Sequence, residues 1–141
     1  MVIYRERLTP NVGIHVALLL LLPLGFGMLA PINIVWGIIN AVSIYALGIA
    51  WLVFGAPLLV VTTDSLRAGR ATISRDELGA ATVVERADRA GALADARAWK
   101  VIRAWIPRGV RVEIADANDP APHWYLSSRH PEKLVAALTT R

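Results

Sequence analysis

The sequence predicts a membrane α-helical hairpin followed by a small α+β domain with short antiparallel strands, a bent sheet and a C-terminal helix. Three observations support this prediction. Residues 8–63 contain no Asp, Glu, Lys or Arg. Short strand-like runs separated by turn residues follow from residue 58 onward, and the C-terminal segment is amphipathic. We therefore divide the chain into an N-terminal segment (1–11), a two-helix hairpin (12–57) and an α+β domain (58–141).

The composition narrows the class of protein further. Hydrophobic residues make up 55% of the 141 residues, charged residues only 18%, and the mean hydropathy of +0.48 is too high for an ordinary soluble domain. The length allows one domain and hardly two. Because the chain contains no cysteine, disulfides, cysteine-ligated zinc and a thiol nucleophile are all excluded.

The uncharged stretch is long enough for two membrane crossings, since one crossing needs ~20 residues. Pro31 is the expected break, because a proline lacks the N–H that would continue a helix. We expect helices over residues 12–30 and 32–54, with a kink at Pro23.

Two other interpretations of the apolar stretch are weaker. A buried soluble hairpin would need more chain than follows Thr63 to surround it. A cleaved signal peptide would place Met28 where a small residue is expected and Pro31 directly after the cut.

The positive charges predict the topology. Arg5 and Arg7 precede the first helix, and the connecting turn has no basic residue. The second helix is followed by Arg67, Arg70 and Arg75. The positive-inside rule places both termini in the cytoplasm, so we expect a two-pass protein of the plasma membrane.

Small and polar residues recur every fourth position on the second helix, at Asn33, Gly37 and Ala41. Such a stripe allows close contact between helices. It predicts packing against the first helix or against a second copy of the chain.

The expected elements of the C-terminal part follow in order. Strands are predicted at 58–63, 66–68, 71–74, 80–86, 99–105, 110–115 and 123–128, a helical turn capped by Ser74 at 75–78, and a helix at 131–140. Residues 88–98 fit either a short helix or a loop. The order fits a bent sheet plugged at one end by a helix, as in pleckstrin-homology-like modules, and also a plain α+β sandwich.

No catalytic signature is present. The sequence lacks a phosphate-binding glycine loop, His-Glu-x-x-His and Gly-x-Ser-x-Gly. The histidines do not have metal-ligand spacing, and residues 116–119 fit Asx turns better than a calcium loop. We expect no metal, no cofactor and no enzymatic activity; an enzyme using Asp116, Asp119 or His123 on lipid-borne substrates is the least favoured hypothesis.

One basic and aromatic segment stands out between Arg97 and Arg111. Arginine and tryptophan are frequent in binding hot spots, and basic groups beside a membrane attract anionic lipids. No nucleic-acid recognition motif accompanies them. Strand alternation could also scatter these charges over two faces. The candidate surface for a protein or anionic lipid partner consists of Arg103, Trp105, Arg108, Arg111, Trp124 and Arg129.

The two ends of the chain carry recognisable segments. They are Tyr4-Arg5-Glu6-Arg7-Leu8 at the start, then Trp105-Ile106-Pro107 and Trp124-Tyr125-Leu126-Ser127-Ser128-Arg129 near the end. Together they resemble a family of small two-helix membrane proteins of actinobacteria, classed as a domain of unknown function. The resemblance implies a plasma-membrane protein with a cytoplasmic C-terminal domain and transfers no catalytic residue.

Two non-enzymatic functions fit these observations. The first is a membrane-tethered interaction module that presents its cytoplasmic domain to a protein or anionic lipid. The alternative is an accessory or assembly subunit of a larger membrane complex, bound through its helices. In both, the expected partners are the lipid bilayer and a protein or a second copy of the chain.

Overall fold

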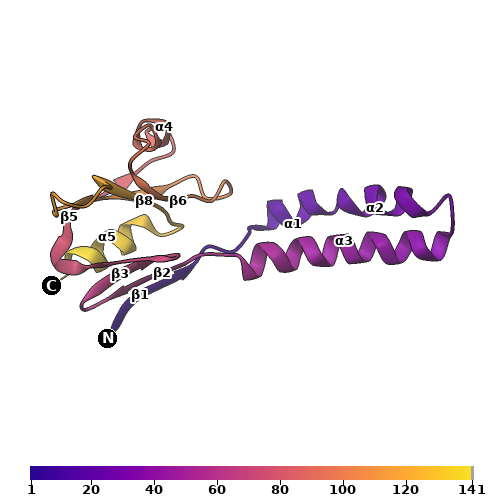
Figure 1. Ribbon diagram of the computed structural model, residues 1–141, viewed down its shortest axis with the longest axis horizontal. Helices are drawn as coiled ribbons and strands as arrows, with labels where there is room; N and C mark the ends of the chain where they lie inside the picture. The colour runs from indigo at the N-terminus through magenta and orange to yellow at the C-terminus, as the bar shows by residue number, and fades with distance from the viewer. Residues whose placement is uncertain (141) are drawn as a thin grey trace. The chain divides into compact units, whose positions relative to one another are not determined.

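The computed structural model describes residues 1–140, and the chain forms two compact units (Figure 1). One unit combines Met1–Leu8 with Pro57–Arg141, and the other is Thr9–Ala56. The prediction of a separate N-terminal segment over residues 1–11 is therefore wrong. Val2–Arg7 form the first strand of the α+β unit, and the helical unit, which begins at Thr9, is inserted after that strand.

The helical unit contains α1 (Val12–Leu18), α2 (Leu21–Leu29) and α3 (Ile34–Phe54). The first apolar segment breaks between α1 and α2 and not at Pro23. Pro23 lies in the first turn of α2, where its missing N–H costs little. Its ring instead clashes with the carbonyl one turn earlier, which disfavours a continuous helix at that point. The second break falls near Pro31, as predicted. Asn33 then begins α3, because its Oδ1 accepts from the Val35 N–H at 2.8 Å.

The first four strands of the α+β unit form one antiparallel sheet. Its order is β1-β2-β3-β4, made of β1 (Val2–Arg7), β2 (Leu58–Thr62), β3 (Ser65–Ala68) and β4 (Ala71–Ser74). The register pairs Arg7 with Leu58, so the helical unit is the connection between two paired strands. Gly69, at a φ of 65°, closes the predicted β3–β4 turn.

The second sheet has the order β5-β7-β8-β6, with β6 and β8 parallel. The predicted helical turn capped by Ser74 precedes this sheet. Residues 88–98, for which the sequence allows either a short helix or a loop, contain one short helix. The elements are η1 (Arg75–Glu77), β5 (Leu78–Val84), α4 (Arg89–Leu93), β6 (Trp99–Val101), β7 (Gly109–Ile114) and β8 (His123–Ser127). The strand predicted at 99–105 ends at Val101.

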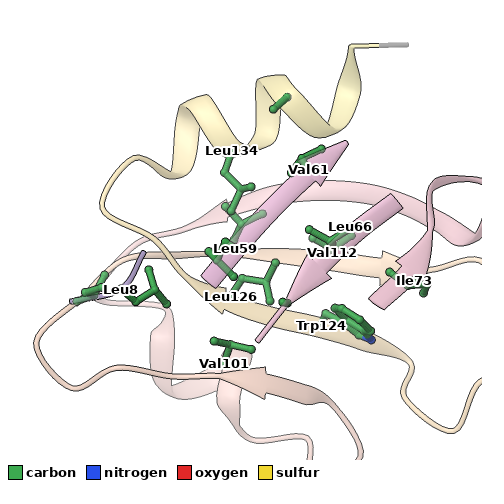
Figure 2. Packing of buried hydrophobic residues seen from close by; sticks show 14 residues of the cluster. Leu8, Leu59, Val61, Leu66, Ile73, Val101, Val112, Trp124, Leu126 and Leu134 are labelled. Carbon is green, nitrogen blue, oxygen red and sulfur yellow. The ribbon is translucent and has the colours of Figure 1, made fainter. Parts of the chain in front are cut away.

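The inner faces of the two sheets and the C-terminal helix α5 (Pro131–Thr139) share one hydrophobic core (Figure 2). Leu59 and Val61 come from the first sheet, Val112 and Leu126 from the second, and Leu134 from α5. The prediction of antiparallel strands with a C-terminal helix is confirmed, but the strands form two sheets and not one bent sheet. Arg75 fixes the end of α5 by donating to the carbonyls of Ala137, Leu138 and Thr140 at 2.6–2.8 Å.

Candidate functional site

A buried carboxylate joins the two ends of the α+β unit. Glu6 of β1 is only 9% exposed. Its Oε2 accepts from the hydroxyls of Tyr4 and Ser128, each at 2.6 Å, and its Oε1 accepts from the Arg129 N–H at 2.9 Å. Ser128 Oγ also accepts from the His130 N–H at 3.1 Å. We call Tyr4, Glu6, Ser128 and the Arg129 N–H the Glu6 cluster.

The hydrogen bonds of the Glu6 cluster have a structural role. A buried carboxylate is tolerated when several donors reach it, and here three do. Burial raises the pKa of Tyr4, and its hydrogen bond to Glu6 raises it further, so the phenol remains a protonated donor. Ser128 is fully buried and cannot meet a substrate without local opening. The cluster therefore ties β1 to the segment between β8 and α5.

The cluster also explains why the first and last recognisable segments occur together. The first supplies Tyr4 and Glu6, and the last supplies Ser128 and Arg129. Sequence reasoning singled out both segments but assigned no role to Glu6 or Ser128. The available signal was the alternation of Tyr4, Glu6 and Leu8, which places a charged residue at an inward-facing strand position.

Trp124 is a correction to the candidate surface. The sequence prediction placed it on an exposed basic and aromatic face. Its side chain is only 5% exposed and lies in the core between the two sheets. Trp124 and Leu126 are both at inward-facing positions of β8, so the tryptophan fills the core. Trp99 packs against Trp124 with ring centroids 6.2 Å apart.

Arg108 is engaged by two glutamates. Its Nη2 and Nε contact both carboxylate oxygens of Glu85 at 2.6 and 2.9 Å, and Nη2 also contacts Glu132 of α5. Hydrogen bonds from Arg108 lower the pKa of Glu85 and of Glu132, and both glutamates raise the pKa of Arg108. Arg108 therefore links the start of α5 to the end of β5.

The remaining candidates also have partners within the chain. Arg103 lies over the Trp105 ring at 5.9 Å and donates to the Ile102 carbonyl. Arg111 pairs with Glu113 at 2.7 Å. Arg129 donates its backbone N–H to Glu6 and its guanidinium to the Arg7 carbonyl. With Trp124 buried and these arginines engaged, the six residues are a poor match for one open headgroup surface.

Two of the three residues in the predicted stripe on α3, Gly37 and Ala41, make close contacts between helices. Gly37 is buried against Ala30, and a Cβ on Gly37 would come within 3.0 Å of it. Ala41 is buried against Gly25 of α2, where an added Cβ would lie 2.9 Å from the Ala41 Cα. Asn33 is instead the N-cap of α3. Gly37 and Ala41 thus pack α3 onto the first apolar segment, one of the two partners that the sequence allowed.

Three buried polar side chains have no hydrogen-bond partner in the part of the chain that the structure describes. They are the Trp105 indole N–H, the Tyr125 hydroxyl and both ring nitrogens of His123, which is 2% exposed. Asp116 and Asp119 accept from backbone N–H groups two residues on, which confirms the predicted Asx turns. Within residues 1–140, no three His, Asp or Glu side chains come together as a metal site.

The α+β unit carries shallow hollows on its surface, two of which are defined by their lining residues. The larger, about 640 Å³, is bordered by η1, the start of β5 and the end of α5, with Arg75 and Asp76 among its lining. Arg75 is already occupied by the carbonyls that end α5. The smaller, about 450 Å³, lies between α4 and the outer side of β5, with Arg111 at its edge.

Fold and site together define a small two-unit protein in which an apolar helical hairpin is inserted between the first two strands of an α+β domain. The sequence profile of one family, described as "Protein of unknown function (DUF3093)", matches residues 3–138. The chain belongs to this family. The match includes the hairpin, the α+β unit and all members of the Glu6 cluster. No curated protein and no solved structure matches the chain.

Proposed function

We propose that this protein is a two-pass plasma-membrane protein that holds a non-enzymatic interaction domain at the cytoplasmic surface. The observation that carries the proposal is the place of the hairpin between paired strands β1 and β2. Two chain connections, and not one, join the domain to the helices. Such a double connection restricts how far and how freely the domain can move from the membrane.

The surface of the hairpin supports a lipid environment. The apolar segments Val12–Leu29 and Ile34–Phe54 are long enough to cross a bilayer, and their buried residues are Gly25, Gly37 and Ala41. Large apolar side chains such as Leu47 and Trp51 are exposed. The core helix of a soluble protein would bury these groups.

The first strand argues against a cleaved signal peptide. A cut after Ala30 would remove β1, and with it Glu6 and the fully buried Leu8. Ser128 and the Arg129 N–H would then lose the carboxylate to which they donate. The complete fold of the α+β unit therefore needs the residues that precede the hairpin.

The shape of the domain fits the interaction role. α5 contacts β1 of the first sheet and β5 and β7 of the second. This packing supports our proposal of a pleckstrin-homology-like module, which needs such a terminal helix. The parallel β6–β8 pair departs from a purely antiparallel pattern. The accessory-subunit alternative is less favoured, because the stripe that would bind a partner helix packs within the chain.

Membrane fractionation and topology mapping test this proposal. The full chain should remain in the pellet after alkaline carbonate extraction, as an integral protein does. Fluorescent or phosphatase reporters fused to each terminus should both report the cytoplasm. Full release by carbonate, or a terminus that is active only outside the cell, contradicts the proposal.

A further inference from the structure

We propose that the outer face of the first sheet binds anionic phospholipid headgroups of the inner leaflet. This inference rests on the proposed membrane insertion and names the partner of the domain. The basic face consists of the outward side chains Arg5, Arg7, Val60, Arg67 and Thr72, with Arg70 in the β3–β4 turn.

The strand register places these residues on one face. Arg5 pairs with Val60, and Val60 pairs with Arg67, so the three stand side by side across β1, β2 and β3. Side chains at directly paired positions project to the same face, and two strand spacings put Arg5 and Arg67 ~10 Å apart. The neighbouring row, which includes Leu59 and Ala68, is fully buried in the core. The basic face is therefore the opposite, solvent-exposed side of the sheet, away from α5 and the second sheet (Figure 1).

The charge on this face is of one sign. The acidic residue within β1–β4 is Glu6, and it points into the core. Among the described residues, Arg5, Arg67 and Arg70 form no salt bridge, whereas Arg97, Arg108 and Arg111 all do. Basic groups without acidic neighbours keep their full attraction for an anionic surface.

The basic end of the face is the end from which the chain continues into the hairpin. Gly69, beside Arg70, donates its N–H to the Leu58 carbonyl, and Arg7 pairs with Leu58. The acidic Asp64 lies in the turn at the other end of β2. Leu8 can be at most ~15 Å from Val12, the first residue of α1, because each residue spans no more than ~3.6 Å. Covalent reach alone thus keeps this end near the membrane surface.

Headgroup contact can be measured on the full chain in proteoliposomes. The cysteine-free sequence permits a single fluorescent label at Thr72→Cys on the basic face and, as a matched control, at Ala90→Cys on α4. Vesicles contain either phosphatidylcholine alone or phosphatidylcholine with phosphatidylglycerol, and both carry a small fraction of headgroup-linked quencher. We expect the Thr72 label to be quenched several-fold more in the anionic vesicles, and the Ala90 label to differ little between them.

Two triple variants of equal charge separate a specific face from net charge. R5Q/R67Q/R70Q should abolish the additional quenching at the Thr72 label, and high salt should do the same by screening. R86Q/R97Q/K133Q removes as much charge elsewhere and should retain it. Equal quenching of wild type in neutral and anionic vesicles, or equal behaviour of the two variants, overturns the inference.

The same samples distinguish failure of this inference from failure of the proposed function. Vesicle flotation after carbonate treatment reports insertion independently of headgroup contact. Chain that floats without anion-dependent quenching overturns only the headgroup assignment. Chain that does not float contradicts the membrane proposal itself. If the Thr72 label were shielded in native membranes but not in anionic vesicles of lipid alone, the partner would be an acidic protein. That result would also overturn the lipid assignment.

Discussion

The two units of the molecule bury opposite kinds of side chain. In the hairpin, the buried residues of α2 and α3 are Gly25, Gly37 and Ala41. In the α+β unit, the core is built from large side chains such as Trp124 and Leu126. Water drives large apolar groups together, whereas lipid tails solvate them as well as another helix does. Helices in lipid instead gain from close backbone contact, which small residues permit.

The contrast can be tested most strongly with matched leucines. Leu126→Ala removes a fully buried side chain between the two sheets and should lower the stability of the α+β unit by about 2–5 kcal/mol. Leu47→Ala removes a side chain that is 69% exposed and should leave both units as stable as wild type in lipid. Thermal unfolding of the full chain in proteoliposomes, followed by circular dichroism, measures both. A comparable loss of stability in the two variants would contradict this difference between the two units.

The units also differ in how far sequence predicts them. The hairpin ends and the alternation in β7 follow directly from hydropathy and period, and both are confirmed. β1 was missed because its inward positions include Glu6, a charge whose partners lie at the other end of the chain. No local sequence pattern indicates that Ser128 donates a hydrogen bond to Glu6.

The predicted exposure of Trp124 is wrong for a related physical reason. Alternation places Trp124 and Leu126 on one face of β8, but it does not say whether that face is covered. The first sheet, formed by β1 before the hairpin and by β2, β3 and β4 after it, covers that face. Likewise, Arg108 looks like a free cation in sequence, and only the fold brings Glu85 and Glu132 to it. Non-local pairing decides both cases.

The Glu6 cluster is expected to give the next largest effect. Ser128→Ala removes one donor from a buried carboxylate and should cost about 1–3 kcal/mol. Ser43→Ala is the matched change on the exposed side of α3 and should cost little. Hydrogen exchange should show faster opening of β1 in Ser128→Ala. Unchanged protection of β1 would mean that the cluster does not hold the two ends of the unit together.

Close packing in the hairpin is expected to give a smaller effect, because two contributions oppose each other. Gly37→Ala puts a Cβ 3.0 Å from the Ala30 backbone, while alanine itself favours the helix by about 1 kcal/mol. Overpacking costs about 1–3 kcal/mol, so we expect a net loss of about 1 kcal/mol. Gly27→Ala meets no atom within 4 Å and should be neutral or stabilising. Dodecyl sulfate titration, monitored by energy transfer between labels on α2 and α3, ranks the variants, and the reverse order would rule out close packing at Gly37.

The smallest effect concerns the exposed ion pairs of Arg108. Because the pKa values of Glu85 and Glu132 are lowered in the folded chain, their stabilisation is present above the ordinary glutamate pKa of about 4.3 and is lost as the pH falls through the lowered values. NMR titration of the two carboxylates should show both midpoints rising towards the ordinary value in Arg108→Gln, and high salt should produce part of the same rise in wild type. Arg97→Gln, which removes the pair with Asp95, should leave both midpoints unchanged. If Arg108→Gln left them unchanged as well, Arg108 would not be the cation that links α5 to β5, and the fastening of α5 would depend on its buried face and Arg75 alone.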